Sequence, residues 1–158
     1  MKSLKITVAV LISGSLINLA QAETTYKTFA TVKTDLQTMD WNGGKVTMGT
    51  LKGVVITSNS SDPALNGEGI QTCYLRVIRI KDSSDVFAHC TLTDKDGDIS
   101  YLTAERKQGD ASSGSGGRGK ITMLGGTGKW QGKTGSCDYT AKYLKDNWQT
   151  TESSCVMK

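Results

Sequence analysis

The feature that most constrains the fold of this chain is a glycine-rich stretch near its C-terminal end, residues 124–135. Within the eleven residues after Leu124 there are five glycines, namely Gly125, Gly126, Gly128, Gly132 and Gly135. Glycine adopts positive φ without steric cost, so this density indicates backbone held in tight turns. One large aromatic, Trp130, lies among them. We therefore expect a strand–turn–strand joint in which the Trp130 ring packs as a plug against bare backbone.

The first 22 residues have the pattern of a secretory signal peptide. Lys2 and Lys5 form a positively charged start, residues 6–19 are largely apolar, and Ala20-Gln21-Ala22 supplies a small-x-small cleavage site. The apolar run is short for a bilayer span, and no second run of spanning length follows it. We predict cleavage after Ala22 and export to the periplasm or beyond. The mature chain, residues 23–158, then has the length of a single domain.

The mature chain carries little net charge. The precursor has 19 Lys and Arg against 15 Asp and Glu, and removal of Lys2 and Lys5 leaves 17 basic side chains. This small excess is spread along the sequence without a block of like charges. The pattern gives no support for nucleic acid or a membrane surface as a partner.

All four cysteines lie in the exported part, which predicts two disulfides in an oxidising compartment. Of the three possible connectivities we favour Cys73–Cys90 and Cys137–Cys155, because the members of each pair lie on consecutive expected strands. Each closed loop, of about 17 or 18 residues, would add roughly 3 kcal/mol of stability. No Cys-x-x-Cys spacing is present and the chain holds one His, so we expect no metal site and no cofactor.

The exported part reads as a series of strands without a helical period. Runs rich in β-branched and aromatic residues are separated by turn signals such as Trp41-Asn42-Gly43-Gly44, and a Gly/Ser loop covers residues 108–117. The expected strands cover residues 26–34, 45–58, 70–81, 86–93, 99–107, 120–124, 136–144 and 148–157. Gly49 and Gly53 are interpreted as bulges or bends. Sequential antiparallel pairing predicts an all-β, up-and-down eight-stranded barrel, with a β-sandwich as the alternative.

Residues 125–135, Gly-Gly-Thr-Gly-Lys-Trp-Gln-Gly-Lys-Thr-Gly, resemble the Gly-Gly-Thr-Gly-Lys-aromatic-x-Gly-x-x-Gly signature of the allene oxide cyclase and dirigent-protein superfamily. The resemblance implies an eight-stranded antiparallel barrel of calycin-like shape, often a homo-oligomer, whose lumen holds an apolar ligand. In plants the cyclases close an epoxide into a cyclopentenone, and dirigent proteins steer radical coupling. Outside this stretch no motif matches theirs residue by residue, so the resemblance implies a fold and assigns no catalytic residue.

The acidic run Asp94-Lys95-Asp96-Gly97-Asp98 has the spacing of the first calcium ligands of an EF-hand. Ile99 stands where that loop requires Gly, and no helical pattern flanks it. A hairpin turn built on Asp-Gly explains the same residues, and we favour it. The glycine-rich stretch likewise lacks the Gly-Lys-Ser/Thr ending of a phosphate-binding loop, so we interpret it as structural.

Strand alternation suggests which side chains reach the lumen. Polar residues alternate with Tyr139 and Tyr143 on residues 136–144, so we predict that both tyrosines face inward and bind ligand. Arg76 is a further ligand-binding candidate. If Arg76 and Glu105 both point inward they would form a polar spot in an apolar lumen, whereas two solvated side chains are the ordinary outcome.

Three functions remain open from the sequence. The leading hypothesis is a non-catalytic exported barrel that binds a small apolar molecule or acts as a scaffold. The second is an isomerase or cyclase acting on a lipid-like substrate in the lumen, with Glu105 and Tyr101 as its nearest acid candidates. The third is an interaction protein using its outer surface, with Trp41 and Trp148 as contacts. The lone His89 should face outward, opposite the disulfide face.

Overall fold

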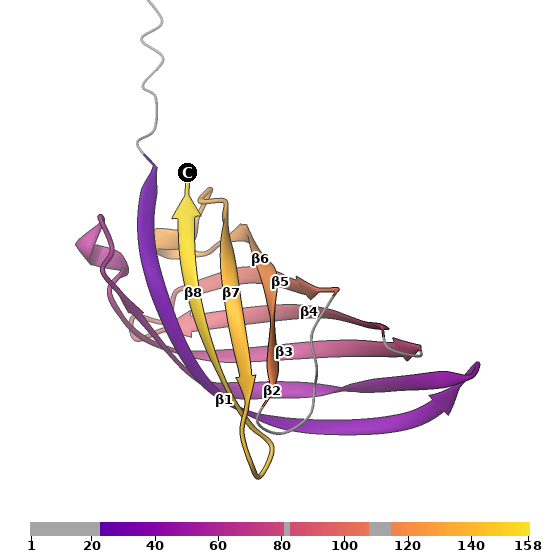
Figure 1. Cartoon of the computed structure of the whole chain (residues 1–158). Helices are drawn as coiled ribbons and strands as arrows, with labels where there is room; N and C mark the ends of the chain where they lie inside the picture. The colour runs from indigo at the N-terminus through magenta and orange to yellow at the C-terminus, as the bar shows by residue number, and fades with distance from the viewer. Residues whose placement is uncertain (1–22, 81–82, 108–114) are drawn as a thin grey trace, which may run out of the picture.

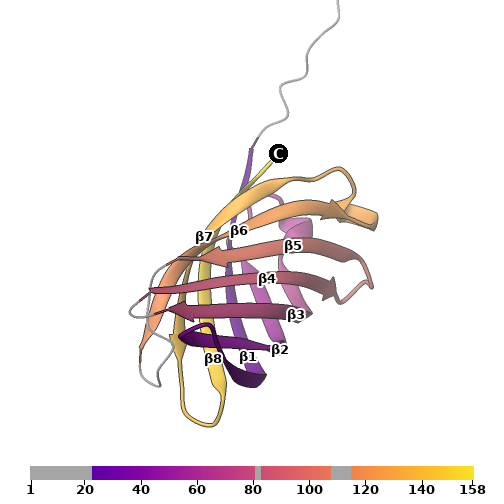
Figure 2. The same cartoon turned by 90° about the vertical axis from the view of Figure 1, so that its right-hand side faces the viewer.

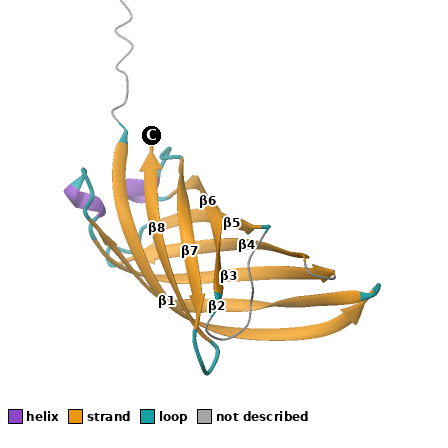
Figure 3. Ribbon diagram, viewed as in Figure 1, coloured by secondary structure: helices purple, strands orange, loops and turns teal. Residues whose placement is uncertain are grey.

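The computed structural model describes residues 23–80, 83–107 and 115–158 (Figure 1). The predicted signal peptide (residues 1–22), residues 81–82 and most of the predicted Gly/Ser loop (residues 108–114) lie outside the described residues. Eight strands make up most of the described chain. They are β1 (Thr24–Trp41), β2 (Gly44–Ser58), β3 (Gly67–Ile80), β4 (Ser83–Asp94), β5 (Ile99–Arg106), β6 (Gly116–Gly126), β7 (Gly135–Tyr143) and β8 (Trp148–Met157). Two short 3-10 helices, η1 (Pro63–Leu65) and η2 (Gly128–Trp130), lie toward one end of the sheet (Figure 3).

The sheet is a closed antiparallel barrel in which every strand pairs with its neighbour in sequence and β8 returns to pair with β1. The expected up-and-down eight-stranded barrel is therefore confirmed, and the β-sandwich alternative is wrong. Figure 2 shows β3, β4 and β5 running side by side across the wall that faces the viewer. No helix in the described part of the chain is long and apolar enough to cross a membrane.

The first hairpin is longer than the sequence predicts. β1 pairs with β2 as far as Trp41, but it pairs with β8 only as far as Lys33. The turn between β1 and β2 has a φ of 48° at Asn42 and of 74° at Gly43. Two successive positive φ values suit the twist of a tight hairpin. The β1–β2 hairpin therefore projects beyond the closed barrel, which is visible on the right of Figure 1.

Gly49 and Gly53 mark a bend and not a bulge. The pairing of β2 with both of its neighbours runs through them without a register shift. A Cβ at Gly49 would collide with the carbonyl oxygen of Asp35, and one at Gly53 with that of Thr31. The absence of a side chain at these two positions thus lets β2 pack closely against the curved β1.

Both predicted disulfides are present. Cys73–Cys90 joins directly paired residues of β3 and β4, and Cys137–Cys155 does the same for β7 and β8. All four cysteines are buried. These two cross-links are consistent with an oxidising compartment.

The part of the core that lies next to η2 contains a buried phenol. Tyr26 packs with Met123, Trp130 and Met157, and its hydroxyl donates a hydrogen bond to Met123 Sδ at 2.6 Å. Burial raises the pKa of Tyr26 well above its ordinary value, because the phenolate would lose its hydration there.

Tyr26→Phe should reduce the loss of stability that the wild type suffers at alkaline pH. Because the folded-state pKa is raised, the Tyr26 contribution is complete below about pH 10, the value for an unfolded tyrosine, and is lost as the pH rises above it. The wild type should lose up to about 1.4 kcal/mol per pH unit more than the variant in that range. Urea unfolding at pH 7 and at alkaline pH measures the difference.

The matched control is Tyr74→Phe, which removes an exposed phenol on the outer face. That variant should keep the wild-type profile. Identical profiles for Tyr26→Phe and the wild type would contradict the burial of the Tyr26 hydroxyl.

Candidate functional site

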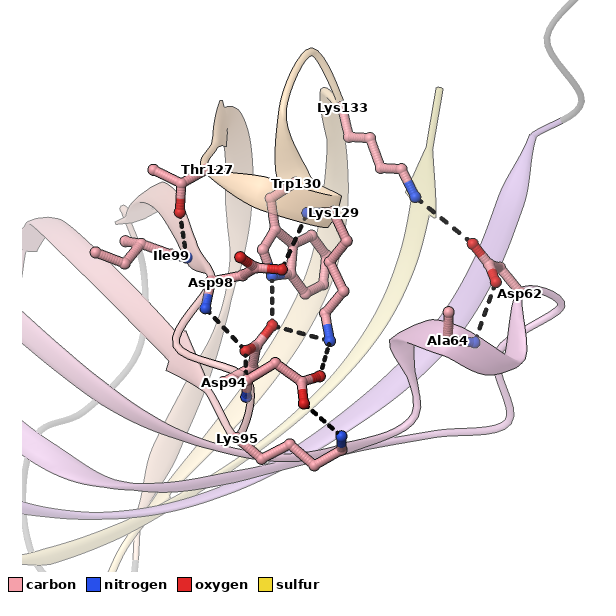
Figure 4. Close-up of polar contacts among 11 residues, drawn as sticks. Asp62, Ala64, Asp94, Lys95, Asp98, Ile99, Thr127, Lys129, Trp130 and Lys133 are labelled. Atoms are coloured by element: carbon pink, nitrogen blue, oxygen red, sulfur yellow. Dashed lines mark hydrogen bonds and ion pairs between the residues drawn. The ribbon is translucent and has the colours of Figure 1, made fainter.

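One end of the barrel is closed by the glycine-rich joint. Trp130 lies on η2, is only 3% exposed, and packs against Tyr26, Leu65 and Met123. Its indole Nε1–H donates a hydrogen bond to Asp94 Oδ2 at 3.0 Å (Figure 4). The predicted plug is therefore confirmed, and the stretch forms the expected strand–turn–strand joint.

The β4–β5 turn holds this plug in place. β4 ends at Asp94 and β5 begins at Ile99, which confirms the hairpin interpretation of the acidic run. Asp94 Oδ1 accepts hydrogen bonds from the backbone N–H groups of Asp96, at 2.9 Å, and of Asp98, at 3.0 Å. The Lys129 ammonium lies 3.0 Å from Asp94 Oδ2 and 3.2 Å from Asp96 Oδ2 (Figure 4). A lysine from the glycine-rich joint thus sits between two carboxylates of the turn.

These contacts stabilise the charged forms on both sides. Burial alone would raise the pKa of Asp94, but the hydrogen bonds from Lys129, Trp130 and the turn backbone lower it below the ordinary value. Burial alone would lower the pKa of Lys129, whereas its bonds to Asp94 and Asp96 raise it. The Asp94–Lys129 pair is ionised at neutral pH and fixes the joint to the β4–β5 turn.

Gly128 is required by this arrangement. Its φ is +50°, and a Cβ there would collide with the Asp98 carboxylate. That carboxylate accepts the backbone N–H of Lys129 at 3.1 Å. Glycine at this position lets the acidic turn reach the backbone of η2.

The lumen behind the plug is nearly filled. Its cavity has a volume of about 70 Å³ and is lined by Tyr26, Val55, Leu92, Leu102 and Met123 among others. A single water needs roughly 10–15 Å³ measured in this way, and ligand pockets usually span about 300–1,000 Å³. The lumen therefore has room for a few waters and not for a drug-sized molecule.

A larger groove opens at the opposite end, under the projecting β1–β2 hairpin. This mouth groove has a volume of about 570 Å³ and is bounded by β1, β2, β3 and the β7–β8 turn. Its apolar lining residues are Leu36, Leu51, Leu75, Val77, Leu144 and Trp148. Its size is in the usual range for a small-molecule site.

The edge of the mouth groove is mainly cationic. Lys45, Arg79 and Lys145 line it, against one carboxylate, Asp146. Asp146 and Asn147 both have positive φ, 56° and 61°, in the tight β7–β8 turn. The groove therefore combines apolar walls with a positively charged rim.

Tyr139 and Tyr143 face inward as predicted, but neither lines the lumen cavity. Tyr139 is buried, and its ring lies where a Cβ at Gly119 would be. Burial raises its pKa. Tyr143 lines the mouth groove. A role in ligand binding is therefore open to Tyr143 at the mouth.

The structure also places a buried cation that sequence reasoning missed. Arg106, at the end of β5, is 3% exposed, donates a hydrogen bond to the Tyr143 hydroxyl at 2.8 Å and lies over its ring. The sequence held one signal for this placement. Arg106 is two residues beyond Ala104 on β5, and side chains at that spacing share a face of the strand. Arg106 therefore orients the Tyr143 side chain, which lines the mouth groove.

Three predicted site residues are in the wrong place for a lumen. Arg76, Tyr101 and Glu105 are exposed on the outer face. In the sheet, Arg76 of β3 and Glu105 of β5 are each the register partner of Phe87 on β4, so the β4 strand separates the two residues. The inward face of β5 carries Ser100, Leu102, Ala104 and Arg106. The placement of Glu105 and Tyr101 as lumen acids and of Arg76 as a lumen ligand is therefore corrected.

The remaining sequence predictions concern the outer surface. His89 is exposed on β4 and contacts the Phe87 ring edge-on at 5.0 Å between centroids. Both predicted contact tryptophans are exposed, Trp41 at the tip of the first hairpin and Trp148 at the mouth groove.

Comparison of the chain with protein-family models, with curated proteins and with solved structures found no match.

Proposed function

We propose that this protein is an exported, non-catalytic binding protein that holds a small apolar ligand in the mouth groove. The observation that carries the proposal is the contrast between the lumen cavity, of about 70 Å³, and the apolar mouth groove, of about 570 Å³. Burial of apolar ligand surface against Leu36, Leu75 and Trp148 supplies the affinity. The groove adjoins the filled barrel, since Leu51 and Gln149 line both the groove and the lumen cavity.

Two further observations support this assignment. The glycine-rich motif resembles that of the allene oxide cyclase and dirigent-protein superfamily, and we propose that the chain is an exported relative of that group. Export rests on the leader pattern of residues 1–22, and the two disulfides are consistent with it. The cyclase alternative is less well supported, since Glu105 lies on the outer face.

The experiment is a fluorescence titration with N-phenyl-1-naphthylamine, an uncharged aromatic probe that brightens in apolar surroundings. The wild type should bind it at one site. Leu36→Ser should weaken binding by roughly tenfold, because Leu36 lines the groove and a buried leucine contributes about 1.5–3 kcal/mol.

The matched control is Met39→Ser, three residues further along β1. Met39 is exposed, pairs with Val46 and does not line the groove, so its loss should change the affinity less than twofold. Equal effects of the two substitutions, or absence of binding to the wild type, would contradict the proposed function.

A further inference from the structure

The second half of β1 presents an unpaired strand edge. β8 pairs with β1 up to Lys33, and the next contact on that side is the Thr34 N–H to Asn147 O bond at 2.8 Å. In the part of the chain that the structure describes, no strand pairs with residues 35–41 on that side. Figure 1 shows this half of β1 as the lower rim of the sheet, with no strand beyond it.

The direction of the backbone groups on this edge follows from two contacts. The N–H of Thr34 points to the β8 side, whereas the carbonyl of Asp35 points toward Gly49 on β2. Backbone groups of successive residues in a strand alternate between its two sides. The N–H and C=O groups of Leu36, Thr38 and Asp40 therefore project from the open edge.

The edge lacks three of the features that usually block strand addition, namely proline, lysine and a bulge, and its two charged side chains are Asp35 and Asp40. Residues 35–41, Asp-Leu-Gln-Thr-Met-Asp-Trp, contain no proline and no lysine. Their register with β2 is continuous from Asp35↔Thr50 to Trp41↔Gly44, without a bulge. Natural proteins protect exposed edges with such devices, since unpaired N–H and C=O groups recruit another strand.

We propose that this edge pairs with the same edge of a second copy of the chain, antiparallel about a twofold axis at Thr38. In that register Thr38 bonds Thr38 of the second copy, and Leu36 of each copy bonds Asp40 of the other. Every outward N–H and C=O of these three residues then has a partner. The contact is isologous, so it closes at a dimer.

The side chains of the edge are compatible with this register. Asp35 lies opposite Trp41, and Gln37 opposite Met39, so no two carboxylates face each other across the axis. Met39 and Trp41, 58% and 50% exposed in the single chain, gain neighbours in the dimer. Pairing along the edge requires no ligand in the mouth groove.

The first test measures amide hydrogen exchange by NMR on the wild type at low and high protein concentration. At high concentration the amides of Leu36, Thr38 and Asp40 should become protected. Those of Gln37 and Met39, which point toward β2, should change little. A chain that stays monomeric at the highest accessible concentration overturns the proposal, as does a dimer in which these amides remain unprotected.

The second test is sedimentation equilibrium of Thr38→Pro with Thr38→Ala as its control. Both substitutions remove the Thr38 hydroxyl, which lies 2.8 Å from that of Thr47, but only proline removes the outward N–H. Because that N–H points away from β2, proline leaves the β1–β2 bonds intact. Thr38→Pro should weaken the dimer roughly 10- to 100-fold relative to Thr38→Ala. Equal dissociation constants would overturn edge pairing and leave another face, or a different partner, for the contact.

Discussion

Replacing Trp130 with alanine should lower the free energy of unfolding by about 3–5 kcal/mol. The ring is 3% exposed and belongs to the cluster that contains Tyr26, Met123 and the Cys137–Cys155 disulfide. Removal of the ring leaves a cavity at the closed end of the barrel. It also removes the indole N–H that donates a hydrogen bond to the Asp94 carboxylate. Urea or guanidinium unfolding of the wild type and the variant measures the loss.

Trp41→Ala is the control for this substitution. Trp41 is 50% exposed at the tip of the first hairpin, so its loss should change the free energy of unfolding by no more than about 0.5 kcal/mol. A Trp130→Ala effect as small as that of Trp41→Ala would contradict the plug.

Asp94→Ala should cost about 2–4 kcal/mol, because one carboxylate accepts four hydrogen bonds. Its partners are the Trp130 indole, the Lys129 ammonium and the N–H groups of Asp96 and Asp98. The Asp94 side chain is about 10% exposed, so water replaces these bonds poorly. Denaturant unfolding at pH 7 gives the difference.

The control is Asp96→Ala, which removes a carboxylate that also contacts Lys129 but is half exposed. Its effect should be much smaller than that of Asp94→Ala, since exposed ion pairs add little. Equal losses for the two variants would show that charge on the turn matters and the buried contacts of Asp94 do not.

The Asp94 pair also predicts an acid dependence. The pKa of Asp94 is lowered in the folded state, so its contribution is complete above about pH 4 and is lost as the pH falls through the folded value. Between pH 7 and strongly acidic pH, the wild type should therefore lose more stability than Asp94→Ala. Parallel pH profiles of the two proteins would contradict the ionised pair.

The local signals of the sequence predicted much of the fold. Short alternating runs and turn residues gave the strand order, and cysteines on consecutive strands gave both disulfides, because directly paired residues of a hairpin share a face. Dense glycine around one aromatic predicted the plug at Trp130. The strand order and the disulfides depend on contacts within one hairpin, whereas the partners of Trp130, which include Tyr26 and Asp94, lie far away in the sequence.

The functional surfaces depend on how far neighbouring strands extend past one another, which the sequence does not encode locally. Residues 35–41 contain Asp and Gln and have weak strand propensity, yet pairing with β2 makes them part of β1. The mouth groove arises because β1 continues to Trp41, whereas its pairing with β8 ends at Lys33. No local sequence pattern reveals that difference. The faces of β5 were ambiguous because each carries both polar and apolar side chains, and only the register with β4 and β6 decides that Tyr101 and Glu105 point outward.

The most direct test of the binding proposal is an NMR measurement of nuclear Overhauser effects between N-phenyl-1-naphthylamine and the methyl groups of the protein. The structure predicts contacts to Leu75, Val77 and Leu144, which line the mouth groove and not the lumen. Contacts confined to Val55 and Leu92 in the lumen, or to Ile56 and Ile70 on the outer face, would contradict a binding site at the mouth of the barrel.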